Sequence, residues 1–240
     1  MIRRRFILVS VLLGLLAASL FAGPYLNHRR LAFQPSGGGV SFAHTDSSTG
    51  SYTGTTTFSS MSIGTADAGR LVDAITFKRG AGDITGVTIG GVSATLLATA
   101  SATLDQKTQH WVASVPTGTT ADVVVTFDSG SPLCCLSVYA LYGYSATPYA
   151  TQITTGTANP QSVNIAVATD GAVIAGVMSP ATGPSCSWTG VTEDVDLDTS
   201  TTDTFSSGST GPDPADASYS VSVSGGDNRQ PLAVVSFEPL

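Results

Sequence analysis

Residues 71–98 read LVDAITFKRGAGDITGVTIGGVSATLLA, and this stretch indicates the fold class. Three runs rich in Val, Ile, Thr and Phe, at 71–77, 84–89 and 92–98, are separated by turn residues. Short runs of this composition bounded by glycine are typical of β-strands. The pair Gly90 and Gly91 predicts a tight hairpin, because only glycine accepts the positive φ angles of a primed turn without steric cost.

The same pattern continues through the rest of the chain, with a hydrophobic period of two rather than 3.6. The runs at 172–178 and 232–237 are almost continuously apolar, as expected of strands in the middle of a layered protein. The stretch 199–217, rich in Ser, Thr, Gly and Asp, is predicted to be a loop. We therefore predict an all-β fold, an antiparallel β-sandwich of jelly-roll or immunoglobulin-like type. Further strands are expected at 110–115, 122–127, 133–142, 163–168, 187–197 and 219–223.

The N-terminal residues have a different composition from the rest of the chain. Three arginines within residues 1–6 precede seventeen uncharged residues at 7–23, and a second basic pair follows at Arg29 and Arg30. This is the layout of an export signal or a short membrane anchor. A helix of this length spans roughly 25 Å, slightly less than the hydrocarbon core of a bilayer, about 30 Å thick.

The domain prediction follows from this change in composition. We predict a basic and hydrophobic N-terminal anchor at 1–33 that includes a short hydrophobic helix, a Gly-rich linker at 34–39 and a β-sandwich domain at 40–240. No sequence repeat divides the body into smaller domains. The apolar residues that we expect to hold the anchor in an assembly are Ile7, Leu12, Leu13, Leu15, Leu16 and Phe21.

The net charge of −7 conceals an uneven distribution of charge along the chain. Five of the ten basic residues lie within residues 1–30, which leaves five basic and seventeen acidic residues, a net charge of −12, for the body. An acidic body repels phosphate and lacks the electrostatic attraction that dominates binding to nucleic acid. We therefore expect no nucleic-acid partner.

The three cysteines, Cys134, Cys135 and Cys186, are too few for a disulfide framework and lack the spacing of a zinc site. Cys134 and Cys135 are neighbours on an expected strand, so their side chains point to opposite faces and at most one of them could pair with Cys186. We interpret all three as small buried apolar residues. A disulfide between Cys135 and Cys186 stays open as an alternative.

Several of these segments together resemble a known family. GVTIGGVSATLLA at 86–98, VPTGTT at 115–120, VVVTF at 123–127 and VYALY at 138–142 follow one another in an order similar to β-sandwich proteins of tailed-phage and prophage structural genes and of bacterial secreted modules. LAVVSFEP at 232–239 resembles the strand that closes these proteins. The resemblance covers about residues 55–240. Its motifs are structural, so it implies a sandwich fold and no catalytic residues.

Residues with catalytic or metal-binding chemistry do not form a recognisable motif. His28, His44 and His110 are widely separated, and no nucleophile elbow, zinc-protease motif or phosphate-binding loop occurs. We therefore predict no enzymatic activity and no cofactor.

One acidic segment is a weak candidate for a metal site. Asp194, Asp196 and Asp198 alternate with apolar residues as in the first half of a calcium loop, but Thr199 and Phe205 stand where the turn Gly and the bidentate Glu belong. We prefer to interpret the acids as an edge strand protected against pairing.

Aromatic residues offer a second candidate surface, for stacking sugars or binding a protein: Trp111, Tyr139, Tyr142, Tyr144, Tyr149 and Trp188. The preferred interpretation is that they fill the sandwich core or its rim.

Together these observations predict a surface-exposed structural protein of a bacteriophage virion: a capsid (head) decoration, fibre-base or tail accessory module. Its N-terminus anchors it, and its expected partners are other virion proteins in a homo- or hetero-oligomer. The alternative is an exported or membrane-tethered module of the bacterial cell surface, inserted in the membrane through residues 7–23 and binding a host-surface glycan.

Overall fold

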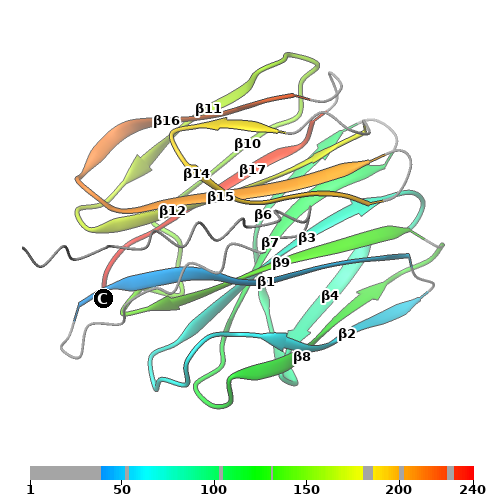
Figure 1. Cartoon of the computed structure of the whole chain (residues 1–240), viewed down its shortest axis with the longest axis horizontal. Helices are drawn as coiled ribbons and strands as arrows, with labels where there is room; N and C mark the ends of the chain where they lie inside the picture. The colour runs from blue at the N-terminus through cyan, green and yellow to red at the C-terminus, as the bar shows by residue number, and fades with distance from the viewer. Residues whose placement is uncertain are drawn as a thin grey trace, which may run out of the picture.

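A computed structural model describes residues 39–51, 54–102, 105–130, 132–180, 186–199, 203–225 and 230–240. These residues form β-strands and no helix, which confirms the predicted all-β class (Figure 1). The predicted N-terminal helix, and the predicted linker apart from Gly39, lie outside the described residues.

The strands form four sheets, which we number 1 to 4 in the order in which they stack (Figure 1). Sheet 1 contains, in spatial order, β2 (Thr55–Ser62), β8 (Thr120–Phe127), β4 (Ile84–Ile89) and β5 (Val92–Ser93). Sheet 2 contains β1 (Ser41–Ser51), β9 (Leu133–Tyr142), β3 (Leu71–Arg79), β7 (Gln106–Ser114) and β6 (Thr95–Ala102). Sheet 3 contains β10 (Ala150–Thr154), β17 (Leu232–Phe237), β12 (Gly171–Ser179), β15 (Thr204–Asp213) and β14 (Thr192–Asp198). Sheet 4 contains β11 (Gln161–Val167), β16 (Asp216–Ser224) and β13 (Ser187–Thr189).

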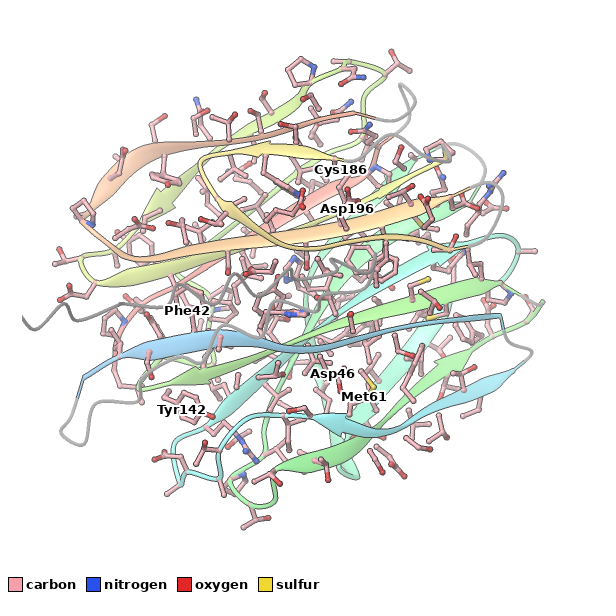
Figure 2. The ribbon with its side chains drawn as sticks, in the orientation of Figure 1. Phe42, Asp46, Met61, Tyr142, Cys186 and Asp196 are labelled. Atoms are coloured by element: carbon pink, nitrogen blue, oxygen red, sulfur yellow. The ribbon has the colours of Figure 1, made fainter. Side chains whose placement is uncertain are left out.

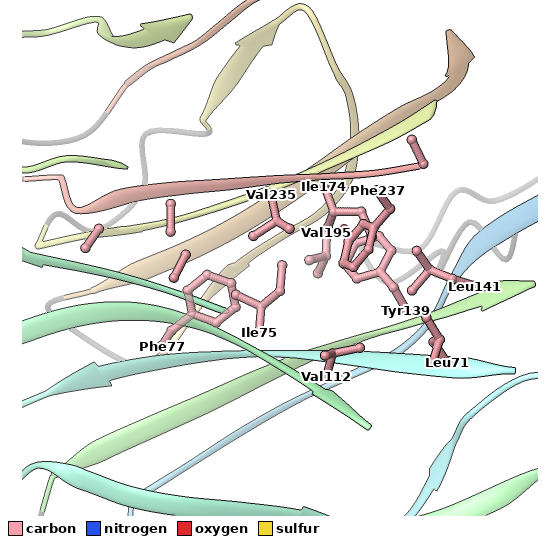
Figure 3. Close-up of a cluster of buried hydrophobic side chains, with 14 of the residues drawn as sticks. Leu71, Ile75, Phe77, Val112, Tyr139, Leu141, Ile174, Val195, Val235 and Phe237 are labelled. Atoms are coloured by element: carbon pink, nitrogen blue, oxygen red, sulfur yellow. The ribbon is translucent and has the colours of Figure 1, made fainter. Parts of the chain in front are cut away.

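Three hydrophobic clusters separate the four sheets, and alternation along the strands explains them. On β3, Val72 and Ala74 face sheet 1, whereas Ile75 and Phe77 face sheet 3. Figure 3 shows the middle cluster, in which Ile75 and Phe77 lie opposite residues of sheet 3 that include Val235. Sheets 2 and 3 are therefore covered on both faces.

This double coverage explains the two nearly continuous apolar runs in the sequence. All residues of β12 and β17 are buried, which confirms that both strands lie in the middle of the stack. The hairpin at Gly90 and Gly91 is also confirmed, because it joins β4 to β5 and the two glycines have φ angles of 59° and 79°. Both values lie in the region that only glycine adopts readily.

The strands of each half pair in a nested way, the first with the last. In the N-terminal half, β1 pairs with β9, β2 with β8, β3 with β7 and β4 with β5. In the C-terminal half, β10 pairs with β17, β11 with β16 and β12 with β15. All of these pairs are antiparallel, so each half is a long hairpin that is folded over into two sheets.

The two halves have the same strand order. When β1, β9, β3, β7 and β6 of sheet 2 are replaced by β10, β17, β12, β15 and β14, the order of sheet 3 results. Likewise, the order β2, β8, β4 in sheet 1 corresponds to the order β11, β16, β13 in sheet 4. Sequence analysis found no repeat, because the repetition lies in the topology and not in the residues.

The predicted loop at 199–217 is wrong, because β15 occupies Thr204–Asp213 and lies between β12 and β14. Its serines are buried, but each has a hydrogen-bond partner: Ser206 donates to the carbonyl oxygen of Val195 at 2.8 Å, and Ser207 contacts Ser137 Oγ at 2.9 Å. Gly208 is required there, because a Cβ atom would lie 2.8 Å from the carbonyl oxygen of Thr192. A polar strand is therefore stabilised by hydrogen bonds to a neighbouring strand and to the adjacent layer.

Candidate functional site

The side chains best suited to acid–base chemistry lie between sheets 2 and 3. Asp73 on β3 and His110 on β7 are fully buried, and Oδ2 of Asp73 lies 2.8 Å from Nδ1 of His110. The second ring nitrogen, Nε2, lies 3.3 Å from the carbonyl oxygen of Ala233 on β17. Both ring nitrogens of His110 therefore face oxygen atoms, one on β3 and one on β17. The pair links the two halves, and its complete burial prevents contact with a substrate.

A second polar cluster lies between the same sheets, centred on the buried Tyr139 of β9. Its hydroxyl group donates to Ser207 Oγ at 2.7 Å and lies 3.2 Å from Oδ2 of Asp194. Ser209 also donates to this carboxylate. Burial raises the pKa of Tyr139 well above its usual value. The phenol therefore stays protonated and connects sheet 2 to β14 and β15 of sheet 3.

His44 on β1 lies beside this cluster. Its ring packs edge-on against Tyr139, with the ring centroids 5.2 Å apart. Burial lowers the pKa of His44 from 6.5 to about 4, although Asp46 opposes this shift. Nε2 of His44 is buried without a hydrogen-bond partner among the described residues. His44 is therefore neutral at pH 7.

The acids Asp194, Asp196 and Asp198 do not converge on one point. Asp194 accepts from the Ser209 hydroxyl and lies beside Tyr139 of sheet 2, whereas Asp198 accepts from the Thr204 hydroxyl at 2.6 Å. Oδ2 of Asp196 accepts from the backbone N–H of Cys186 at 2.9 Å (Figure 2). Burial raises the pKa of Asp196 to about 6. β14 is the last strand of sheet 3, so the acidic row lies at a sheet edge as we expected.

A metal ion would need several of these ligands around one point. Among the residues that the structure describes, no three His, Cys, Asp or Glu side chains form a group that could hold one.

The three cysteines are free and buried, so the Cys135–Cys186 disulfide is not formed. Cys134 lies in the cluster between sheets 1 and 2, Cys135 between sheets 2 and 3, and Cys186 between sheets 3 and 4. The opposite orientation of Cys134 and Cys135 is thereby confirmed. Burial raises the pKa of both Cys135 and Cys186 to about 12. All three are protonated thiols at neutral pH, which are poor nucleophiles and poor metal ligands.

Arg70 is a buried charge that the sequence analysis missed. Arg70 is fully buried and donates five hydrogen bonds, all to backbone carbonyl oxygens, at 2.8–2.9 Å. The acceptors are Gly64, Thr65, Val115, Thr117 and Gly118. These contacts fasten the loop before β3 to the loop after β7. No local pattern could reveal this role, because the acceptors are main-chain atoms of distant turns.

The aromatic residues are divided between core and surface. Tyr139, Tyr144 and Trp111 are buried, as the preferred interpretation expected, and Trp188 is half-buried with its Nε1 donating to Ser206. Tyr149 differs, because 47% of its surface is exposed just before β10. Two neighbouring strands, β6 and β10, also have large exposed apolar residues, Leu96 and Ile153.

Comparison of the chain with protein families, with curated proteins and with solved structures finds no match. Within the described residues, no helix has the length and the apolar character that a membrane span needs. The anchor residues Ile7, Leu12, Leu13, Leu15, Leu16 and Phe21 lie outside these residues.

Proposed function

We propose that the chain is a non-enzymatic structural protein of a phage virion, a head decoration, fibre-base or tail accessory module. The observation that carries this proposal is the nested pairing of strands, first with last, in both halves. We infer from it that each half is a β-sandwich of the jelly-roll type rather than the immunoglobulin type. Jelly rolls are common in viral capsid proteins.

The chemistry of the described residues supports a role without catalysis. The fully buried Asp73–His110 pair is shielded from any substrate, and Nε2 of His44 has no hydrogen-bond partner among the described residues. The thiols have pKa values that burial raises. These polar groups join one sheet to the next, which is a structural task.

The proposal assigns attachment to the N-terminal residues. Residues 7–23 are apolar on all sides if they form a helix, and such a helix is stable only when it is buried on all sides. In a virion it is buried among protein subunits, while the acidic body faces solvent. No nucleic acid or cofactor is needed.

Deletion of residues 1–30 tests this assignment. We expect the shortened protein to stay folded by circular dichroism but to be absent from particles purified on a density gradient. A variant with residues 7–23 in scrambled order keeps the apolar composition and is the matched control, which separates specific packing from general hydrophobicity. Shortened protein that copurifies with particles at the normal ratio would show that attachment runs through the body.

A second candidate function is an exported or membrane-tethered module of the bacterial surface that binds glycans. Two features favour it: jelly rolls also occur in lectin domains, and the exposed Tyr149 offers a ring for stacking a sugar. In this case deletion of residues 1–30 releases the body from the membrane fraction. An intact mass of native protein then shows whether residues 1–23 are retained.

A further inference from the structure

One peptide bond at the end of β15 has a chemistry that occurs nowhere else in the chain. Asp213 is the last residue of β15 and Pro214 follows it, and the sequence contains no other Asp–Pro bond. The nitrogen of this bond carries no hydrogen and belongs to a tertiary amide, which takes up a proton more readily than an ordinary peptide nitrogen. The carboxyl group of an aspartate reaches its own carbonyl carbon by closing a five-membered ring. An Asp–Pro bond therefore combines a nucleophile with a good leaving group.

The fold favours the neutral form of the Asp213 carboxyl group. Its Oδ2 atom is buried and has no hydrogen-bond partner among the described residues. Burial raises the pKa of Asp213 above its usual range, although a hydrogen bond from the Thr210 side chain opposes this shift. The carboxyl group therefore keeps its proton at a higher pH than an exposed aspartate does.

The titratable groups around Asp213 are phenols and other carboxyl groups. Tyr144, which precedes β10, and Tyr219 of β16 both interact electrostatically with Asp213. The first of these phenols also faces Asp170, and the second faces Asp216. None of these four groups is cationic, so none of them favours the ionised form of Asp213. The two further carboxylates instead favour a positive charge nearby, such as a proton on the Pro214 nitrogen.

A second aspartate bond with its own side reaction, Asp170–Gly171, is protected by the fold. Rearrangement at this bond requires the backbone nitrogen of Gly171 to attack the Asp170 carboxyl carbon. That nitrogen donates its hydrogen to the carbonyl oxygen of Ala168 at 2.9 Å, and Gly171 is buried. Pro214, in contrast, is exposed, so water can reach the bond that precedes it. The fold therefore leaves one of the two bonds open to reaction.

We propose that the protein cleaves its own chain at the Asp213–Pro214 bond in mild acid. The Asp213 carboxyl group gives its proton to the Pro214 nitrogen, and Oδ2 attacks the carbonyl carbon of Asp213. The C–N bond breaks with its electron pair left on nitrogen, which gives a cyclic anhydride at Asp213 and a free amine at Pro214. One water molecule then opens the anhydride to two carboxyl groups. The sum is hydrolysis of one peptide bond, without an oxidant or a reductant.

Cleavage at this bond leaves every strand with its neighbours. β15 stays between β12 and β14, whereas β16 stays between β11 and β13. β17 likewise keeps β10 and β12. The C-terminal piece, residues 214–240, therefore remains in the stack, and only the covalent link between β15 of sheet 3 and β16 of sheet 4 is lost. The proposal does not rest on the function in a virion.

Intact-mass measurement under denaturing conditions tests the proposal. The full chain is held in mild detergent at pH 5 and at pH 7, and release of the 214–240 piece is followed over time. We expect the piece to appear at pH 5 and more slowly at pH 7, because only the protonated carboxyl group supplies the proton. A synthetic peptide of residues 208–219 is the matched control for acid lability without a fold. The folded protein should cleave at least about tenfold faster than the peptide, since the fold restricts the side chain and favours its neutral form.

Two variants identify the reacting groups. Asp213→Glu keeps the acid but requires a six-membered ring, and Pro214→Ala replaces the tertiary amide by a secondary one. Each should lower the rate of cleavage at least about tenfold. Circular dichroism checks their folding, and Pro214→Ala changes an exposed residue, so it keeps the test valid if Asp213→Glu is unstable.

Three results would overturn the proposal. The first is a folded wild type that releases no 214–240 piece at pH 5. The second is the same rate for the protein and the peptide, which would reduce the reaction to general acid lability. The third is cleavage of Pro214→Ala at the wild-type rate, which would identify a contaminating protease.

Discussion

The N-terminal and C-terminal halves share a strand order but fill it with different polar chemistry. The N-terminal half buries cationic groups, among them Arg70 and Lys78, that donate to backbone carbonyl oxygens. The C-terminal half has one basic residue, Arg229, in its sequence and contacts the neighbouring layers through serine hydroxyl groups: Ser206 accepts from Trp188 of sheet 4, and Ser207 contacts Ser137 of sheet 2. The apolar alternation is common to both halves. The comparison therefore teaches that alternation sets this topology, whereas the buried polar contacts are specific to each half.

The largest loss of stability is expected when the two halves are separated. Each half contributes one wall of the cluster between sheets 2 and 3, so a half alone would expose apolar residues such as Ile75 or Ile174 to water. We expect residues 143–240 alone to show no cooperative thermal transition by circular dichroism and to bind the dye ANS. Adding residues 39–142 should reduce the dye signal. A sharp transition of the isolated fragment would mean that the halves are independent domains.

The next largest loss of stability is expected from variants of the buried Asp73–His110 pair in the middle cluster. β3 presents Asp73 there, whereas β12, in the equivalent position of sheet 3, presents Ala172, Ile174, Gly176 and Met178. Asp73→Ala removes one member of a fully buried pair and leaves the His110 ring without its partner, which typically costs about 3–5 kcal/mol. The double variant Asp73→Leu with His110→Leu makes this position apolar as in sheet 3. It should lose less stability than Asp73→Ala, as measured by urea unfolding. A larger loss would show that the pair is essential to the packing.

A smaller change in stability is expected from acidification, which should destabilise the protein through His44 of the N-terminal half and stabilise it through Asp196 of the C-terminal half. Burial lowers the pKa of His44 from 6.5 to about 4, so its neutral form favours folding and stability is lost as pH falls from 6.5 to 4. The stability lost through protonation of His44 is at most about 3 kcal/mol. Burial raises the pKa of Asp196 from 3.8 to about 6, so stability is gained as pH falls from 6 to 3.8. Solvent screening makes this gain smaller, because Asp196 is only half-buried.

Urea unfolding of two variants between pH 7 and pH 4 separates these contributions. His44→Phe should lose less stability on acidification than the wild type, and Asp196→Asn should lose more. The same acid dependence in all three proteins would contradict both assignments.

The smallest of these effects concerns the distance between the halves. Gly176 faces sheet 2, and a Cβ atom at this position would lie 2.8 Å from Ile75 Cγ2 and 3.1 Å from Phe77 Cε1. Gly176→Val should therefore lower the free energy of unfolding by about 1–3 kcal/mol, the usual cost of overpacking. The matched control is Gly86→Val on β4, where nothing lies within 4 Å of the added Cβ. Equal midpoints for the two variants would mean that the halves can separate at no cost.

Sequence reasoning was effective where side chains alternate and weak where contacts are distant. The apolar runs predicted β12 and β17, and two glycines predicted the turn between β4 and β5. β15 was missed because its buried face carries serines, whose partners on sheet 2 are about seventy residues away. The Asp73–His110 pair was missed because the two residues are 37 positions apart in the sequence. Anchor residues such as Leu12 and Leu15 stay predictions.

The nested pairing of strands has a consequence for the order of folding during synthesis. β1 must wait for β9, and β10 must wait for β17, before either edge of the central sheets is complete. Contacts between residues so far apart in the sequence make folding slow. A chain that ends before residue 232 would leave both β10 and β12 without their shared neighbour. Incomplete chains would therefore expose unpaired strand edges, which favour aggregation.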